Sequence, residues 1–545
     1  MSWIRTLEWT IRKGFWNFVA KQKYRRNDPK PVDRVAFTPP SFRLIPLAEV
    51  YPEIPITDIL IADRPPPDET YADRGLLTRL VAWLFPRSSG EERVLRTLAR
   101  LYPTRLSPMQ PDRPGILPDP YAALDQAYTT GHRRTVRKKA AALNLDSKRM
   151  LHTPTRPIEL ETFPDLGALA LRGPYAGYVK KVHGTERQYE WDLRELCSYE
   201  AQPDLYEPWA RVLFEFNERE TSLIPCRIEC ELGTILPSDP TWMLASRIAI
   251  CAATTHTALV RHWTWTHMVG GECVAFATRT QLTESHPLCR LLWPHIVGTH
   301  ASNRLAILGQ LVPAGDFEAV YSLTYKSLCL LISKSASTFD LSLFDPSIDG
   351  HRRGVLGTMP TPTLDNCSRL FRIVQIHAER YLRLYYTDET LRYDEQIQNW
   401  MSELDRWLPN GLGLPAAALD CRRLSTVIAK FIYLESVHHE QMGTQLWNYQ
   451  AWADTHPVRV YRDGRRMPED VYQRMINSNY ILNVVRTPLM TDLTHLVLQD
   501  ERAAEATHLV RAFSEELAAL QQSMDRDPWA PWKLYPIDLE ANINA

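Results

Sequence analysis

The sequence predicts a mainly α-helical protein with only a few short strands. From about residue 240 onward, apolar residues recur at helical spacing in one long stretch after another. Strand-like pieces occur near residues 158–195 and 225–235, but they are short and few. Because no internal repeat at solenoid spacing is visible, we expect one large helical body over residues 156–545, behind an irregular segment over residues 1–155.

The irregular segment starts with an amphipathic pattern and continues with proline-rich stretches. Apolar residues recur at helical spacing over residues 1–26, where basic residues follow them. Such a helix either lies on a membrane surface or packs against the body of its own protein. Prolines crowd residues 29–67 and 103–120, which we expect to run as extended straps. Residues 75–101 return to helical spacing, so we expect straps and short helices packed on the body.

The helical body begins with a long pattern from Trp242 to Val269, for which Asp239 and Pro240 are start signals. Six further helical patterns follow it: His300–Leu311, Asn366–Tyr386, Asp394–Leu408, Cys421–Trp452, Pro468–Asn483 and Glu501–Met524. These patterns account for most of the chain after residue 240, which is why we predict a mainly α fold.

Composition narrows the class of protein. Apolar residues make up 44 % and charged residues 23 %, which is typical of a globular protein, and the net charge of −1 predicts no nucleic-acid partner. The nine cysteines are scattered without a C-x-x-C pair, which indicates reduced thiols in a cytoplasm-like compartment. No run of about 18 apolar residues predicts a spanning helix, and charged residues interrupt any N-terminal signal peptide. We therefore expect a cytoplasmic protein, with residues 1–26 as the candidate for peripheral membrane contact.

The most informative local feature is the pair His262 and His267, five residues apart in the first long helix. On a regular α-helix, five steps of about 100° leave two side chains roughly 140° apart, which is too far to hold one ion. In a π-helical turn, residues i and i+5 nearly eclipse, and such turns concentrate at functional sites. The spacing therefore indicates either two unrelated histidines or a π-helical pair that binds a metal.

The surroundings of this pair resemble the lipoxygenase family. The resembling blocks are Ile235-Leu236-Pro237-Ser238-Asp239-Pro240-Thr241-Trp242, His262-Trp263-x-x-Thr266-His267, the H-P-x-x-x-L-L-x-P-H block from His286 to His295, Asp345 to Val355, and Tyr381 to Tyr386. The resemblance covers about residues 160–545 and is strongest from residue 235 on. It implies a single large lipoxygenase-like helical catalytic domain with long central metal-bearing helices. The N-terminal β-sandwich common in plant and animal members is not recognisable.

The resemblance also implies the metal ligands. Position by position, it carries over His262, His267, His439 and the C-terminal carboxylate of Ala545 as ligands of one iron, with manganese as the less favoured ion. His439 matches the family ligand because Ser436 stands three residues before it, as in the family. The neighbouring His438 is then expected behind the ligands or as a core histidine. Neutral imidazoles with one carboxylate suit iron in both oxidation states.

Several positions depart from the family pattern. Gly443 stands where the family has an asparagine, histidine or serine as a fifth ligand, so this ligand position is vacant. Leu446 and Ala258 replace two glutamines that lie behind the family's active site. One extra residue in Gly270-Gly271 separates His267 from Glu272, and the last residue is alanine instead of isoleucine. Because outer groups tune a metal site, the substrate or the reaction could differ.

One further position concerns product stereochemistry. Ala306 aligns with the family position where alanine accompanies S hydroperoxides, so the resemblance implies an S product. The other interpretation of Ala306 is a small residue at a helix contact.

The function that the resemblance implies is that of a non-haem iron dioxygenase. In the family, Fe(III)–OH abstracts hydrogen from a polyunsaturated fatty acid or acyl chain, and O₂ then adds to give a hydroperoxide. The expected partners are therefore a polyunsaturated lipid and O₂. Two alternatives remain: the same fold and iron with altered chemistry (hydroperoxide rearrangement or oxidation of another apolar metabolite), or a non-catalytic lipid-binding relative.

Overall fold

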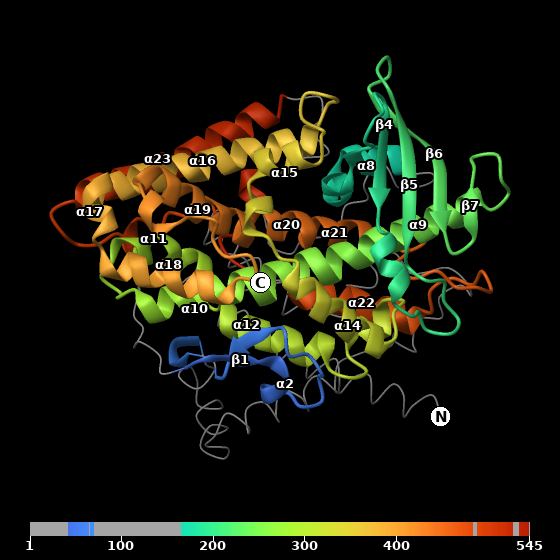
Figure 1. Ribbon diagram of the computed structural model, residues 1–545, viewed down its shortest axis with the longest axis horizontal. Coiled ribbons are helices and arrows are strands. Elements are labelled where there is room, and N and C mark those ends of the chain that lie inside the picture. Colours follow the sequence, from blue (N-terminus) through green and yellow to red (C-terminus); the bar gives the residue numbers. More distant parts are fainter. Residues whose placement is uncertain (1–41, 65, 70–164, 483–487, 527–533, 544–545) are drawn as a thin grey trace, which may run out of the picture.

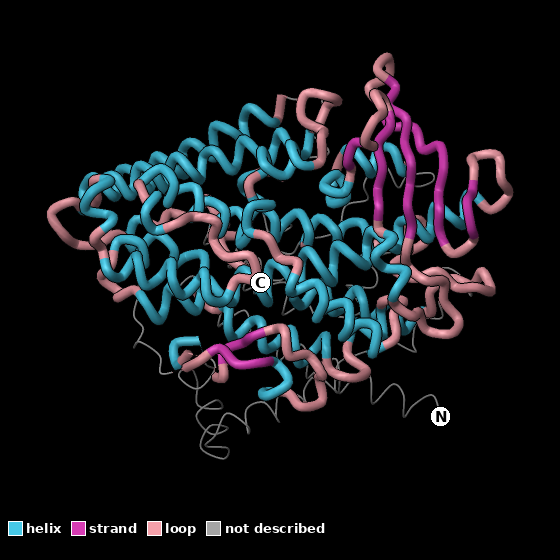
Figure 2. The backbone as a smooth tube through the Cα atoms, in the orientation of Figure 1, coloured by secondary structure: helices cyan, strands magenta, loops and turns pink. Residues whose placement is uncertain are grey.

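The computed structural model describes residues 42–64, 66–69, 165–482, 488–526 and 534–543. The predicted N-terminal helix with its membrane contact, the expected boundary near residue 155, and Ala545 lie outside these residues. Within the described part the protein is mainly α-helical, as predicted, and a small sheet stands at one end (Figures 1 and 2).

One helix of 40 residues, Trp242–Gln281, crosses the centre of the protein (Figure 1). It consists of α9 (Trp242–His256), the π-helix η7 (Thr257–Gly271) and α10 (Glu272–Gln281). The helix is apolar and long enough to cross a membrane, but 83 % of its most apolar window is buried inside the protein. Its composition therefore reflects its place in the core. The predicted end at Val269 is wrong, because Gly270 and Gly271 continue the helix without interruption.

A second long helical run packs against this central helix. It comprises α19 (Cys421–Tyr433), the π-helix η11 (Leu434–His438), α20 (His439–Met442) and α21 (Thr444–Gln450). Asp420 caps its start, because the Asp420 side chain accepts a hydrogen bond from the backbone N–H of Arg423. The two π-helices contact each other, so the positions where both helices widen lie side by side.

The remaining helices surround these two. They are α8 (Leu166–Leu171), α11 (Pro287–Ile296), α12 (Thr299–Ala306) with the π-helix η8 (Ile307–Leu311), α13 (Asp316–Val320), α14 (Tyr325–Ser337), α15 (Pro346–Arg352), α16 (Pro362–Tyr385), α17 (Asp388–Arg392), α18 (Glu395–Trp407), α22 (Glu469–Leu482) and α23 (Ala503–Met524). Short 3₁₀ turns connect them, of which η5 (Gly173–Tyr178) and η9 (Leu341–Phe344) matter below. The longest, α16, packs on both α19 and α23 (Figure 1).

The sheet is larger than the sequence predicts. Five antiparallel strands follow in the order β3 (Lys180–Lys181), β4 (Gln188–Asp192), β5 (Ala210–Asn217), β6 (Ser222–Cys230) and β7 (Gly233–Ile235). Trp191 and Phe214 are buried on its inner face, where their rings meet edge to face at 5.5 Å. The strand β5 and the start of β6 lie outside the predicted strand-like pieces, because proline within β6 and a register shift at Leu213/Phe214 interrupt the strict alternation.

A strap from the N-terminal segment packs on the helical body. It contains β1 (Leu44–Pro46), α2 (Leu47–Val50), β2 (Leu60–Ala62) and the turn η2 (Pro67–Glu69), and it lies below α12 in Figure 1. Arg279 of α10 binds both Asp68 and Glu69 of the strap, at 2.9 and 2.7 Å.

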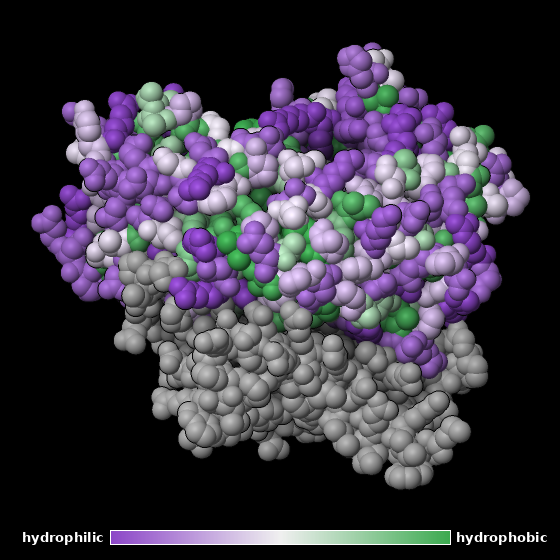
Figure 3. Space-filling model, turned by 60° about the horizontal axis from the view of Figure 1, so that its bottom comes forward, coloured by the Kyte–Doolittle hydropathy of each residue, from purple (hydrophilic) through white to green (hydrophobic). Residues whose placement is uncertain are grey.

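The surface in Figure 3 is hydrophilic along its rim, with hydrophobic side chains gathered in the middle of that face.

Candidate metal centre

Three histidines from the two long helices point their ring nitrogens at one spot. His267 Nε2 lies 3.2 Å from His262 Nε2 and 3.2 Å from His439 Nε2. The ring centres are 4.8 to 5.0 Å apart. The packing of the two helices thus brings His439 to a pair of histidines that lie 172 residues before it in the sequence, counted from His267.

The π-helix explains how His262 and His267 reach the same spot. Within η7 the hydroxyls of Thr264 and Thr266 donate hydrogen bonds to the carbonyls five residues earlier, at 2.7 and 2.8 Å. The wider turn lets residues i and i+5 share one side of the helix. The interpretation of two unrelated histidines therefore does not fit this structure, and the pair forms one face.

The three nitrogens fit a metal ion. At a metal–nitrogen distance of about 2.1 Å, neighbouring ligand nitrogens lie about 3.0–3.4 Å apart, which matches the observed 3.2 Å. Burial lowers the pKa of His262 well below its ordinary value. Burial also lowers the pKa of His267, to about 4, although the hydrogen bond that His267 donates to Asn303 raises it. Both imidazoles are therefore neutral at pH 7, which is the form that binds metal.

Asn303 sets the tautomer of His267. The Asn303 amide nitrogen donates to the backbone carbonyl of His267 at 2.8 Å and to Glu272 Oε2 at 2.7 Å. Its oxygen therefore faces His267 Nδ1 at 3.2 Å and accepts the proton of that nitrogen. With the proton on Nδ1, the lone pair of Nε2 is free to bind a metal.

Glu272 anchors this arrangement from behind. Its Oε1 accepts hydrogen bonds from His300 Nδ1 and from the backbone N–H of Ala62 in the strap, both at 2.8 Å. Burial raises the pKa of Glu272, but His300 and the hydrogen bonds outweigh it, so the pKa lies below its ordinary value. From the sequence, Glu272 was noted only for its spacing from His267. Its contacts with His300 and with Ala62 of the strap were not predicted.

His439 has carboxylates on its other side. Its Nδ1 lies 3.6 Å from Glu540 Oε2, and ligand atoms of His439, Glu440 and Glu540 all lie within 4.8 Å of one another. A carboxylate behind a ligand histidine orients the ring and makes it a better ligand. No pattern in the sequence predicted that Glu540 lies beside His439.

Gly443 lies directly against His262. A Cβ atom on Gly443 would lie 2.7 Å from His262 Nε2 and 2.9 Å from the backbone oxygen of His439. No side chain fits there without moving the imidazole. The vacancy at this position therefore has a steric cause in the packing of the two helices.

Gly271 is needed for a second close approach. A Cβ on Gly271 would lie 2.5 Å from Ile543 Cδ1 and 3.0 Å from Glu435 Oε1. Glu435 is fully buried, and burial raises the pKa of its carboxyl well above the ordinary value, although the Ile543 backbone lowers it. Glu435 is thus a neutral acid that packs between the two π-helices, a residue that the sequence did not reveal.

The other predicted site residues are spread around the histidines. His438 is directed away from the three nitrogens and packs on Phe344, with ring centres 4.8 Å apart. Ala258 and Leu446 are buried within the hydrophobic core, so apolar packing replaces the two glutamines. Ala306 is buried where α12 turns into η8. Ala545 lies outside the described residues, but nearby Ile543 is buried against Gly271.

Comparisons with known proteins agree with this geometry. Residues 232–339 match the family model described as Lipoxygenase. The polyunsaturated fatty acid lipoxygenase ALOX15 of Bos taurus is 25 % identical over 334 residues, which are 56 % of this chain and 50 % of that protein. An epidermal-type (12S)/(13S)-lipoxygenase of Mus musculus is 26 % identical over 53 % of this chain and 46 % of its own length. This chain thus spans about half the length of the curated relatives it matches.

Solved structures share the fold. A LOX deletion variant in complex with arachidonate superposes with a TM-score of 0.69 at 15 % identity, covering 97 % of this chain and 81 % of that chain. A calcium-dependent 11R-lipoxygenase gives 0.68 at 16 % identity, covering 96 % and 80 %. At this identity the similarity establishes the architecture alone.

Proposed function

This chain belongs to the lipoxygenase family, and from that premise we propose that it is an iron-dependent dioxygenase acting on polyunsaturated fatty acids or acyl chains. The product is a lipid hydroperoxide. The observation that carries the proposal is that His267 Nε2 lies 3.2 Å from Nε2 of both His262 and His439, where the π-helix η7 meets the start of α20. Three neutral imidazoles form a donor set that suits iron.

The protein residues have few tasks in this proposal. His262, His267 and His439 hold the ion together with the carboxylate of Ala545, while manganese remains the less favoured occupant. A bound iron supplies one-electron chemistry, by which a bis-allylic C–H bond is broken before O₂ adds. Asn303 fixes the tautomer of His267, and the apolar surroundings that include Leu446 exclude water from a radical intermediate.

Ala306 enters the proposal as the residue that controls stereochemistry. It is small and buried at the end of α12, on the element whose Asn303 contacts His267. We infer an S hydroperoxide from this alanine. Chiral analysis of the product tests the inference, and an R product would contradict it.

The experiment uses the untagged protein, so that its C-terminus stays free. Metal content is measured first, and we expect one iron for each chain. Oxygen uptake and conjugated-diene absorbance are then followed with linoleate and arachidonate. An iron-loaded protein that consumes no oxygen with any polyunsaturated acid would exclude the dioxygenase.

A second candidate function rests on the altered surroundings of the histidines. Gly443, Leu446 and Ala258 all depart from the polar groups of the family, so the same iron site could rearrange a lipid hydroperoxide instead of forming one. Loss of a supplied hydroperoxide without oxygen uptake would favour this candidate. A protein without stoichiometric metal would favour a non-catalytic lipid-binding role.

A further inference from the structure

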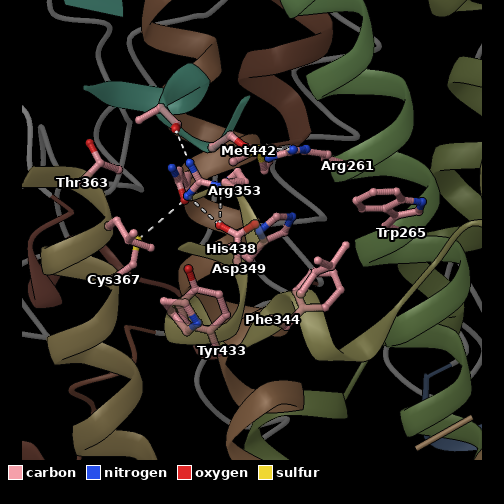
Figure 4. Close-up of a pocket in the computed structure, with 16 residues that line it drawn as sticks. Arg261, Trp265, Phe344, Asp349, Arg353, Thr363, Cys367, Tyr433, His438 and Met442 are labelled. Carbon is pink, nitrogen blue, oxygen red and sulfur yellow. Dashed lines mark hydrogen bonds and ion pairs between the residues drawn. The ribbon is translucent and has the colours of Figure 1, made fainter. Parts of the chain in front are cut away.

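A pocket is lined in part by His438, the residue directly before His439 (Figure 4). Arg261 and Trp265 of η7, His438 of η11, Met442 of α20 and Thr363 of α16 contribute to its wall. Its volume is about 60 Å³, which is enough for several water-sized groups. Arg261 directly precedes His262 and Met442 directly precedes Gly443, so this wall is continuous with the candidate metal centre.

Three buried polar atoms at this pocket have no hydrogen-bond partner among the described residues. They are Arg261 Nε, Thr363 Oγ1 and His438 Nε2. Thr363 is 4 % and His438 is 9 % exposed, so bulk water does not readily satisfy them. Buried polar groups are almost always paired, and three unpaired ones around a single pocket indicate a missing ligand.

The charge of the pocket is positive. Arg353 and Asp349 neutralise each other through two hydrogen bonds of 2.9 and 2.7 Å. Arg261 stacks on the Tyr178 ring at 4.0 Å and donates to the Gly177 carbonyl, but it forms no ion pair with any residue in the described ranges. Its charge therefore remains available to an anion.

The start of α16 adds to this preference. Thr363 belongs to the first turn of this 24-residue helix, whose N-terminal end carries a partial positive charge. The Thr361 side chain does not cap that end. The unpartnered hydroxyl of Thr363 and the positive end of the helix therefore favour an anion, as Arg261 does.

We propose that this pocket binds a carboxylate. Arg261 Nε–H and Thr363 O–H donate to its two oxygens, and the neutral ring of His438 lines the same pocket. A carboxylate offers two acceptor oxygens, which match the two unpartnered donors Arg261 Nε and Thr363 Oγ1. The carboxylate is either the polar end of the acyl substrate or a small free acid, and the part of this proposal that concerns the substrate rests on the proposed function.

The test measures binding, so it does not depend on catalysis. Binding is measured by isothermal titration calorimetry, in metal-free and metal-loaded protein alike. Linoleate, methyl linoleate and butyrate are titrated into the wild type, Arg261→Gln and Thr363→Val. Arg352→Gln is the matched control, because Arg352 is an exposed arginine of α15 that pairs with Asp340 outside the pocket.

We expect linoleate to bind Arg261→Gln about tenfold or more weakly than the wild type, and Thr363→Val severalfold more weakly. Methyl linoleate should bind all variants equally, and Arg352→Gln should match the wild type. Competition by butyrate identifies a site for small acids, and its absence identifies the substrate's own head group. Equal binding of linoleate to the wild type and Arg261→Gln would overturn the proposal, even in an active dioxygenase. Binding that depends on Arg261 would support it, even in an inactive protein.

Discussion

The backbone of Gly443 touches the imidazole of His262, and a methyl group at residue 443 would lie 2.7 Å from His262 Nε2. This close approach joins the second long helix to the first at His262, one of the proposed metal ligands. The position of His262 therefore leaves no room for a side chain at position 443, where the family has its fifth ligand. A polar side chain at position 443 would compete with His262 for the same space.

Substitution of Gly443 should therefore disturb the site. We expect Gly443→Ala to lower the free energy of unfolding by about 1–3 kcal/mol, because the added methyl must push His262 aside. Thermal unfolding measures the loss of stability. Metal analysis of the purified protein should show a lower iron content in the same variant. Gly309→Ala is the control, since no atom lies within 4 Å of its added Cβ. Normal iron content in Gly443→Ala would contradict the close contact.

The two neighbouring histidines of the second helix should behave differently. His267→Ala and His439→Ala should abolish stoichiometric iron binding, since each removes one of the converging nitrogens. His438→Ala should keep most of the iron, because His438 packs on Phe344 away from that spot. Metal analysis of the three purified variants decides the assignment, and loss of iron in His438→Ala alone would reverse it.

Glu272 should contribute stability that depends on pH. Its pKa is lowered in the folded state, so its contribution is present above the unfolded value of about 4.3 and is lost as the pH falls through the folded pKa. We expect Glu272→Gln to cost about 1–3 kcal/mol at pH 7 and less as the pH drops below about 4.3. Urea unfolding between pH 7 and 3.5 measures this difference. Glu501→Gln is the control, because that side chain is 87 % exposed, and a difference that stays constant with pH would argue against an ionised Glu272.

Extension of the chain beyond Ala545 should be as harmful as the loss of a histidine. The prediction follows from the proposal that the terminal carboxylate binds the ion, since a tag converts that carboxylate into an amide. Iron content and oxygen uptake are compared between untagged, N-terminally tagged and C-terminally tagged protein. An active, iron-replete C-terminally tagged protein would show that Ala545 is not a ligand.

Much of the fold could be predicted because helical periodicity is a local property of the chain. The patterns at Asp394–Leu408 and Glu501–Met524 correspond to α18 and α23 within about two residues. The end of the central helix was misplaced, since a pair of glycines normally ends a helix but here serves close packing. The strand β5 and the start of β6 were missed because a bulge and a proline obscure the alternation.

The sequence by itself determined the helical class and the i, i+5 spacing of His262 and His267, because both are encoded in local spacing. The resemblance to lipoxygenases implied His439 as the third ligand, in place of His438. Only the tertiary structure decided what surrounds these histidines. Asn303 of α12 and Glu540 of the C-terminal segment reach them from distant segments, and the strap holds Glu272 of the central helix through Ala62. Likewise, the pocket around Arg261 and Thr363 joins residues about 100 positions apart. Contacts between distant segments depend on how helices pack, and no pattern along a single segment records that packing.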